Sequence, residues 1–361
     1  MNLADALQGC LLGTAAGDSI GLPFENLSRA SVELAMHLPL EQSLLARRGL
    51  VSDDTEHTLM VALTLLEAGD DARLFARRFA ARLRWWLLAL PPGVGGATAR
   101  ATLKLWLGFP PDRSGVHSAG NGPAMRAALF GVVFADRPAL LRDFVRASTR
   151  VTHTDPRAFD AALAVAVAAG CASRHGVLAP AAALERFTQA YRDVADDADA
   201  FAASIALLGE ALRDELPLAG FAQRLGCADG ITGFAPHTVA AALYAWLRHA
   251  GDFRTAVTQI VRCGGDTDST AAIVGAIVGA GVGAQGIPPS WLAGIAEWPR
   301  GVAWMRRCSA ELAAPTHRQR DRPRELAWLP WALARNLAML VVVLWVLVRR
   351  TLLVASRRAM R

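Results

Sequence analysis

The sequence has few cysteines and no arrangement of them that would support a zinc finger or a disulfide framework. No CxxC motif or Cys–His pairing occurs among the five cysteines, which lie at positions 10, 171, 227, 263 and 308. Such scattered thiols are typical of a reducing compartment. The first ten residues contain Asp5 and lack a basic segment, so no secretory signal is predicted. We therefore expect the body of the chain to be cytoplasmic.

Aromatic residues and strand-like segments are also scarce. Aromatics make up 7% of the 361 residues, whereas hydrophobic residues reach 53% and are dominated by alanine, leucine and valine. The run AFDAALAVAVAAGCA (158–172) shows no alternation, and no repeat of fixed period occurs. Small side chains in long runs favour closely packed helices. The sequence predicts an all-α fold with an ample buried core.

The net charge of +6 comes entirely from the end of the chain. Six arginines and no acidic residue follow position 334, at positions 335, 349, 350, 357, 358 and 361. The remaining body has 32 basic and 32 acidic residues. A neutral body does not have the basic surface of a nucleic-acid-binding protein, so no nucleic-acid partner is expected.

The C-terminal region divides into a polar segment and an apolar tail. We predict a body over 1–312, a linker over 313–330 that is rich in charge and proline, and a helix over 331–361. The apolar block 337–348 is shorter than the ~20 residues that a membrane span requires. On a helical wheel most of the tail arginines share one face, which is typical of a helix lying at an anionic membrane surface. Docking on the body or on a partner subunit is the alternative, and a chain lacking 331–361 is expected to stay soluble and active.

Two acidic clusters stand where a loop becomes a helix. The first is SDDTEHT (52–58), and the second is GDTDST (265–270), which opens the small-residue run that ends at Ala280. Helix capping explains one acidic or hydroxyl side chain at each start. Several adjacent carboxylates repel each other unless a cation lies between them, and oxygen ligands suit Mg²⁺, Mn²⁺ or Ca²⁺. Glycines at 275, 279, 281 and 283 would let the second helix approach its neighbours closely.

These clusters resemble the paired metal-binding motifs of the ADP-ribosylglycohydrolase family, and other segments agree in the same order. GCLLGTAAGDSIGLPFE (9–25) is similar to the family's opening block, and SAGNGPAMRAA (118–128) to its glycine-rich substrate loop. THTDPRA (152–158) resembles its histidine block, and GITGFAPHTVAAALYAW (230–246) its adenosine-side segment. The resemblance covers residues 5 to 305 and implies a compact orthogonal helical bundle with hydrolase activity.

The resemblance also implies a set of site residues. Two Mg²⁺ or Mn²⁺ ions would be held by Ser52, Asp53, Asp54, Asp266, Asp268 and Ser269. Glu25, with Asp53 and Asp54, would be catalytic. Substrate would contact Ser118, Gly120, Asn121, Gly122, His153 and Phe234. The family usually has threonine at the positions of Ser52 and Ser269, and serine keeps the hydroxyl group. It often has tyrosine at the position of Phe234, and phenylalanine keeps the aromatic ring without the hydroxyl group.

The implied reaction is hydrolysis of the bond between ADP-ribose and an acceptor, most often an arginine of a protein in bacterial members. A small ADP-ribose conjugate is a second substrate class. Two alternatives remain: a non-catalytic ADP-ribose-binding, immunity or regulatory protein at a membrane, and a metal-dependent phosphohydrolase acting on the diphosphate. Membrane contact is expected only through 331–361.

Overall fold

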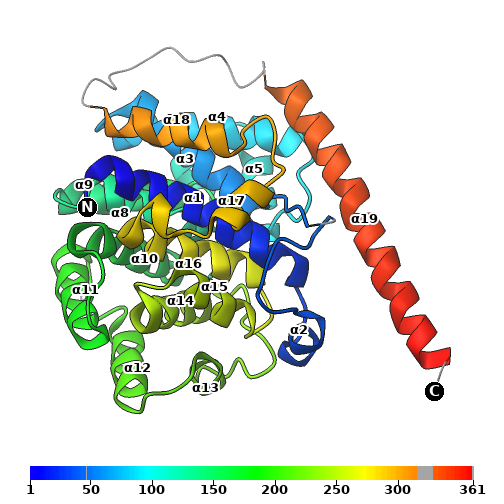
Figure 1. The fold of residues 1–361 in the computed structure, drawn as a ribbon. Coiled ribbons are helices and arrows are strands. Elements are labelled where there is room, and N and C mark those ends of the chain that lie inside the picture. Colours follow the sequence, from blue (N-terminus) through cyan, green and yellow to red (C-terminus); the bar gives the residue numbers. More distant parts are fainter. Residues whose placement is uncertain (46, 198, 315–327, 360–361) are drawn as a thin grey trace.

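The computed structural model describes residues 1–45, 47–197, 199–314 and 328–359, and from residue 346 the description is confined to the backbone. The described chain is helical throughout (Figure 1), and its extended segments pair only as isolated bridges. The all-α prediction is confirmed. The helices are α1 (Leu3–Gly21), η1 (Leu22–Phe24), α2 (Arg29–Ala35), α3 (Asp53–Ala68), α4 (Ala72–Leu88), α5 (Gly96–Trp106), α6 (Pro111–Ser114), α7 (Gly122–Met125), α8 (Ala128–Val133), α9 (Pro138–Arg150), α10 (Pro156–His175), α11 (Pro180–Val194), α12 (Ala202–Arg213), α13 (Leu218–Arg224), α14 (Ala235–His249), α15 (Phe253–Val261), α16 (Thr267–Val282), η2 (Ala284–Gly286), α17 (Pro289–Gly294), α18 (Val302–Ala313) and α19 (Leu329–Ala359).

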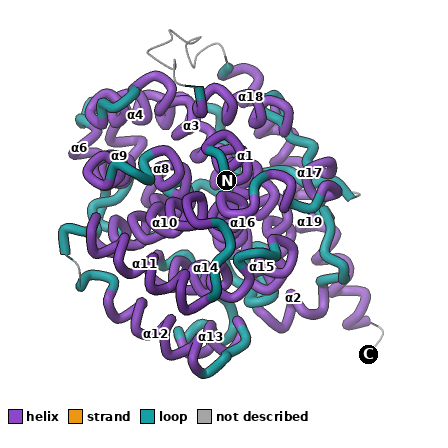
Figure 2. The backbone as a smooth tube through the Cα atoms, turned by 60° about the vertical axis from the view of Figure 1, so that its left-hand side comes forward, coloured by secondary structure: helices purple, strands orange, loops and turns teal. Residues whose placement is uncertain are grey.

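The centre of the molecule is an antiparallel pair formed by α1 and α16, with other helices packed around it (Figures 1 and 2). A Cβ atom added to Gly13 would lie 2.1 Å from the carbonyl oxygen of Gly275, and one added to Gly9 would lie 2.0 Å from that of Gly279. The two backbones therefore touch, and only glycine fits at these crossings. This close pairing fixes the N-terminus of α16 beside the C-terminus of α1.

The polar site lies at that end of the pair. Gly17 and Gly21, in the last turns of α1, lie against Ala271 and Thr267 at the start of α16. Helix α3 begins nearby, because its first residues are bonded to Asp18 of α1. Three helix ends thus meet at one place, and this arrangement brings together the two acidic clusters that the sequence separates.

Helix α19 runs along one side of the body, and its far end extends away from it (Figure 1). It begins two residues before the predicted start at 331. Most of the predicted linker, 315–327, lies outside the described residues, so the division into body, linker and tail stays a prediction. Within the described part, no helix is both long enough and apolar enough to cross a membrane.

The interpretation of Arg335 as a residue facing lipid headgroups was wrong. Its side chain is 4% exposed and points into the body, where it pairs with Glu56 and Glu297. A wheel drawn from the sequence cannot show this, because the two acidic partners come from distant segments. The side chains of Arg349, Arg350, Arg357, Arg358 and Arg361 lie outside the described residues.

Candidate active site

The first acidic cluster is held in place by a buried carboxylate. Asp18, which has no exposed surface, accepts hydrogen bonds from the backbone N–H of Ser52 at 3.0 Å and of Thr55 at 3.1 Å. The Ser52 hydroxyl caps α3 by accepting from the N–H of Asp54 at 3.2 Å. Capping is therefore real, as the alternative interpretation expected, but it uses Ser52 and Asp18 and leaves Asp53 and Asp54 for another purpose.

The second cluster follows a turn that requires two glycines. Gly264 and Gly265 have φ angles of 74° and 84°, in the left-handed region. A Cβ atom on Gly265 would lie 2.1 Å from the carbonyl oxygen of Ile231, to which the N–H of Asp266 donates at 2.7 Å. The turn therefore fixes the direction in which α16 begins. Asp266 is its N-cap residue, and Asp268 and Ser269 lie in its first turn.

The two clusters are in direct contact. The Ser269 hydroxyl donates to Asp54 Oδ2 at 3.1 Å, and the Ser52 hydroxyl donates to the same oxygen at 3.0 Å. Asp266 Oδ2 accepts from the Asn121 amide at 2.7 Å. The structure thus brings together all six residues for which the family resemblance implies a metal-binding role, together with one residue of the glycine-rich loop.

The carboxylates of this site raise one another's pKa values. Burial raises the pKa of Asp54, and the charges of Asp53, Asp18 and Asp266 raise it further. Burial and the neighbouring acids raise the pKa values of Asp53 and Asp268 in the same way. A cluster of buried carboxylates with raised pKa values is destabilising on its own and is a common feature of functional sites.

Asp54 Oδ1 and Asp268 Oδ1 are buried and have no hydrogen-bond partner among the described residues. Orphaned carboxylate oxygens are costly unless something binds them. The described groups of His, Cys, Asp and Glu nevertheless contain no set of three in ligand geometry. Asp54 Oδ2 accepts hydrogen bonds from two hydroxyl groups, which leaves Oδ1 as the oxygen without a partner. The oxygen-only donor set fits a hard divalent ion.

The glycine-rich loop lies against a buried histidine. His153 is 2% exposed and borders the cleft, and a Cβ atom on Gly122 or Gly120 would lie 3.2 or 3.3 Å from its ring. Burial, and then the charge of Arg126, lower its pKa to about 3. The imidazole is therefore neutral at physiological pH. Small residues at 120 and 122 give the histidine access to the cleft.

The cleft that these residues line has a volume of about 730 Å³. Glu25, Asp53, Asp266, Asp268 and Ser269 lie at one part of its wall, and Ser118, Gly120, Asn121, Gly122 and His153 at another. This size suits a ligand of several rings. Ser52 and Asp54 lie behind the wall, in contact with Ser269.

Phe234 is the one predicted substrate residue that does not line this cleft. Its backbone pairs with Gly120, and its ring lies against Arg157, at 5.4 Å, and His237, at 4.9 Å. The phenyl ring is half-buried at the edge of the loop. Phe234 therefore supports the glycine-rich loop from the side.

Two buried residues of the site were missed by the sequence reasoning. Asp18 is part of the quoted opening block, where a lone acid among glycines and apolar residues was the available signal. Arg126, fully buried, donates to the carbonyl of Gly122 at 3.0 Å and to the Thr152 hydroxyl at 2.7 Å, and that hydroxyl contacts His153 at 2.9 Å. Arg126 thus ties the glycine-rich loop to the histidine block, and burial lowers its pKa to about 9.

The chain is similar to known proteins over most of its length. The family model for ADP-ribosylglycohydrolase matches residues 1–323. The ADP-ribosyl-[dinitrogen reductase] glycohydrolase of Rhodospirillum rubrum is 25% identical over 80% of this chain and 89% of its own. The ADP-ribosylhydrolase ARH3 of Gallus gallus is 28% identical over 79% of this chain and 87% of its own. A solved structure described as an ADP-ribosylglycohydrolase-related protein complex is 26% identical, with a TM-score of 0.59, and covers 86% of this chain and 98% of that one.

A hydrolase with an all-α bundle and a carboxylate-lined cleft is the class that fold and site define. The chain belongs to the ADP-ribosylglycohydrolase family. It is an enzyme that hydrolyses the link between ADP-ribose and an acceptor.

Proposed function

We propose that this enzyme removes ADP-ribose from modified arginine side chains of a protein and depends on two Mg²⁺ or Mn²⁺ ions. The observation that carries the proposal is the hydrogen bond from Ser269 to Asp54. It joins two acidic segments 215 residues apart in the sequence at the wall of a cleft large enough for ADP-ribose.

The residues present fit such ions. Six oxygen-bearing side chains converge, two of their carboxylate oxygens are orphaned, and the charges repel in the absence of a cation. The ligands would be Ser52, Asp53, Asp54, Asp266, Asp268 and Ser269. When bound, divalent ions orient ribose hydroxyls and make water more acidic.

The chain's own residues supply the rest of the reaction. Glu25 lies in the cleft wall within electrostatic range of Asp268, and its carboxylate would position a water molecule and accept its proton. Cleavage of a glycosidic bond develops positive charge on the sugar ring, which the surrounding carboxylates stabilise. Asp53, which borders the cleft, would stabilise this charge.

The other part of the cleft wall would bind the substrate. The backbone N–H groups of the loop 118–122 suit a phosphate or ribose oxygen. The neutral His153 imidazole would bind the same end through hydrogen bonds. Phe234 would hold the loop and not stack on the ligand. A protein acceptor is favoured because the Rhodospirillum relative is named for a modified protein.

The test is incubation of the purified chain with ADP-ribosyl-arginine and ADP-ribosyl-serine peptides, with Mg²⁺ or with a chelator. We expect free ADP-ribose and intact arginine peptide with Mg²⁺, and no turnover with chelator. Release of AMP would instead indicate a phosphohydrolase, and binding of ADP-ribose without turnover a non-catalytic module. Preference for the serine peptide would refute the arginine assignment alone.

We propose, separately, that α19 contacts an anionic membrane surface. Five exposed apolar residues of its described part recur at helical spacing: Leu337, Leu340, Val341, Leu344 and Trp345. The sequence beyond them contains five arginines and no acid. Co-sedimentation with phosphatidylglycerol vesicles, lost in Val341→Glu and absent with phosphatidylcholine alone, is the expected result. Recovery of wild-type protein and Val341→Glu in equal amounts in the supernatant would refute the proposed membrane contact.

A further inference from the structure

Helix α19 lies beyond the family match, which ends at residue 323, yet it is fixed to the body. Three neighbouring side chains on one of its faces are almost completely buried: Arg335 (4% exposed), Asn336 (1%) and Met339 (3%). Asn336 donates to the carbonyl of Ala89, at the end of α4, at 2.8 Å. A charged residue this buried in an appended helix needs partners that repay its loss of hydration.

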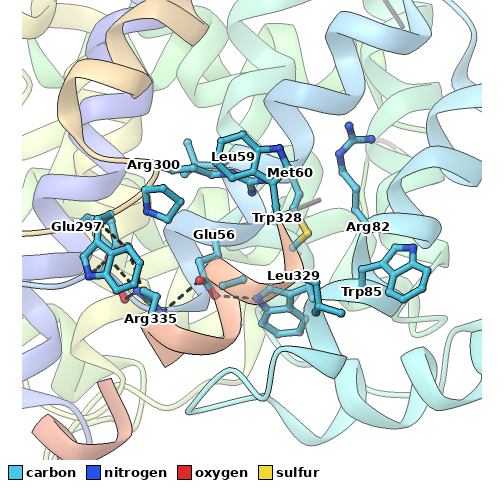
Figure 3. Close-up of a pocket in the computed structure, with 15 residues that line it drawn as sticks. Glu56, Leu59, Met60, Arg82, Trp85, Glu297, Arg300, Trp328, Leu329 and Arg335 are labelled. Carbon is cyan, nitrogen blue, oxygen red and sulfur yellow. Dashed lines mark hydrogen bonds and ion pairs between the residues drawn. The ribbon is translucent and has the colours of Figure 1, made fainter. Parts of the chain in front are cut away.

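Arg335 has such partners on three sides (Figure 3). Its Nε and Nη2 donate to the two oxygens of Glu297 at 3.0 and 2.8 Å, and its Nη1 lies 3.2 Å from Glu56 Oε1. Its Nη2 also donates to the carbonyl oxygen of Val51 at 2.6 Å. The planar guanidinium suits this fork, because one group serves two carboxylates and a carbonyl.

All three partners of Arg335 lie in, or are bonded to, the segment that carries the first acidic cluster. Val51 directly precedes Ser52, and its N–H donates to Glu297 at 3.4 Å. Glu56 lies in the first turn of α3, two residues after Asp54, and the Trp86 indole fixes its other oxygen at 2.7 Å. The segment that carries Ser52, Asp53 and Asp54 is therefore held from within by Asp18 and from outside by Arg335.

The arrangement also matters for charge. The first turn of α3 contains Asp53, Asp54 and Glu56. Arg335 pairs with Glu56 and so holds this carboxylate in place beside the turn. Loss of the positive charge alone would strengthen the binding of a cation, so the weakening expected on removal of Arg335 comes from the lost positioning of the segment. Removal of Arg335 would both free the Val51 carbonyl and leave two glutamates without their cation.

We propose that Arg335 is a positioning residue for the metal-binding segment, so that docking of the C-terminal helix sets the affinity of the active site for divalent ions. The inference rests on the proposed metal dependence. It replaces the expectation that a chain lacking 331–361 would stay active, because that deletion removes the partner of Val51, Glu56 and Glu297.

The test measures Mn²⁺ binding by full-length protein, using electron paramagnetic resonance of the free ion, beside kcat and KM. We expect Arg335→Met to raise the Kd for Mn²⁺ about tenfold, as loss of an outer contact to a metal site does. We expect kcat to fall with little change in KM for the peptide at saturating metal. Arg335→Lys, which keeps a donor for Glu297 and the Val51 carbonyl, should recover part of the affinity.

Met339→Ala is the matched control, since it loosens the same face of α19 without touching the carboxylates. Its Kd should stay within about twofold of wild type. Should Arg335→Met fail to fold, Glu297→Gln weakens the same pair with little change of shape and should raise Kd severalfold. An unchanged Kd in the folded Arg335 variant, or in Glu297→Gln, overturns the proposal. So does an equal loss of affinity in Met339→Ala. If wild-type protein binds no Mn²⁺, the proposed metal dependence fails as well. This result is distinct from failure of the Arg335 proposal alone, in which wild-type protein binds Mn²⁺ and the variants bind it equally well.

Discussion

Replacing Asp54 with asparagine should change the stability of the folded chain in opposite directions with and without Mg²⁺. Asparagine keeps the shape of the side chain and an acceptor oxygen for the hydroxyls of Ser52 and Ser269, but it removes a buried charge. Two like charges about 5 Å apart at an effective dielectric constant of about 20 repel by about 3 kcal/mol. Because the pKa of Asp54 is already raised, part of this repulsion is relieved by protonation. We expect the chelated variant to be about 1–3 kcal/mol more stable than wild type at pH 8.

With Mg²⁺ present the order should reverse. An ion at 100 times its Kd stabilises a folded protein by about 2.7 kcal/mol per site, and a variant that cannot bind it gains nothing. The assay is thermal unfolding of both proteins with chelator and with Mg²⁺, together with turnover, which the substitution should abolish. Asp70→Asn is the control, since Asp70 is an exposed residue paired with Arg137, and its Mg²⁺ response should equal that of wild type. If Mg²⁺ raised the unfolding temperature of Asp54→Asn as much as that of wild type, Asp54 would not be a metal ligand.

Three further predictions follow from the packing and the charges. Gly13→Ala should lower the free energy of unfolding by more than about 3 kcal/mol or prevent folding, because the added Cβ would lie 2.1 Å from a backbone oxygen. The control is Gly95→Ala, where the added Cβ meets no atom within 4 Å. Urea unfolding should show a change of less than about 1 kcal/mol for this control. Chelated protein should lose stability as the pH rises from about 4 through 6. Burial raises the pKa of Asp18 to about 6 and also raises the pKa values of Asp53, Asp54 and Asp268, so the folded chain keeps several protons that the unfolded chain releases, and together they outweigh the opposite effect of one histidine. Mg²⁺ should remove this loss, and a flat profile with chelator would contradict it. His153, whose pKa is lowered to about 3, should act in the opposite direction, because its contribution to stability is lost as the pH falls from about 6.5 to 3. His153→Gln should remove this contribution to the pH dependence of unfolding and should raise KM.

The helices with strong local signals could be predicted from the sequence. The run at 158–172 forms α10, whose start is capped by Asp155, and the small-residue run after Asp266 forms α16. The close approach of α16 to a neighbour was also predicted from its glycines. Gly275 and Gly279 do touch α1, and Gly283, with a φ of 70°, ends the helix beside Gly9 of α1. That α1 is the partner depends on tertiary packing, which no local pattern contains.

The site shows the same division. Clusters of Asp and Ser predicted helix starts and a shared polar centre, because several carboxylates exceed what capping requires. The long-range supports were not predictable in this way. Asp18, Arg126 and Arg335 are buried charges whose partners lie far away in the sequence, so composition and helical wheels do not reveal them. Arg335 is the clearest example, since its place on a wheel indicated the surface and the structure places it in the interior.

Anomalous scattering from a crystal of the full-length chain grown with Mn²⁺ would locate the metal ions that the two acidic clusters are proposed to bind. We expect two peaks at the start of α3 and α16, each about 2.0–2.6 Å from oxygens of Asp53, Asp54, Asp266 or Asp268. Saturating Mn²⁺ that gives no peak between these carboxylates, or peaks only elsewhere on the molecule, would contradict this expectation.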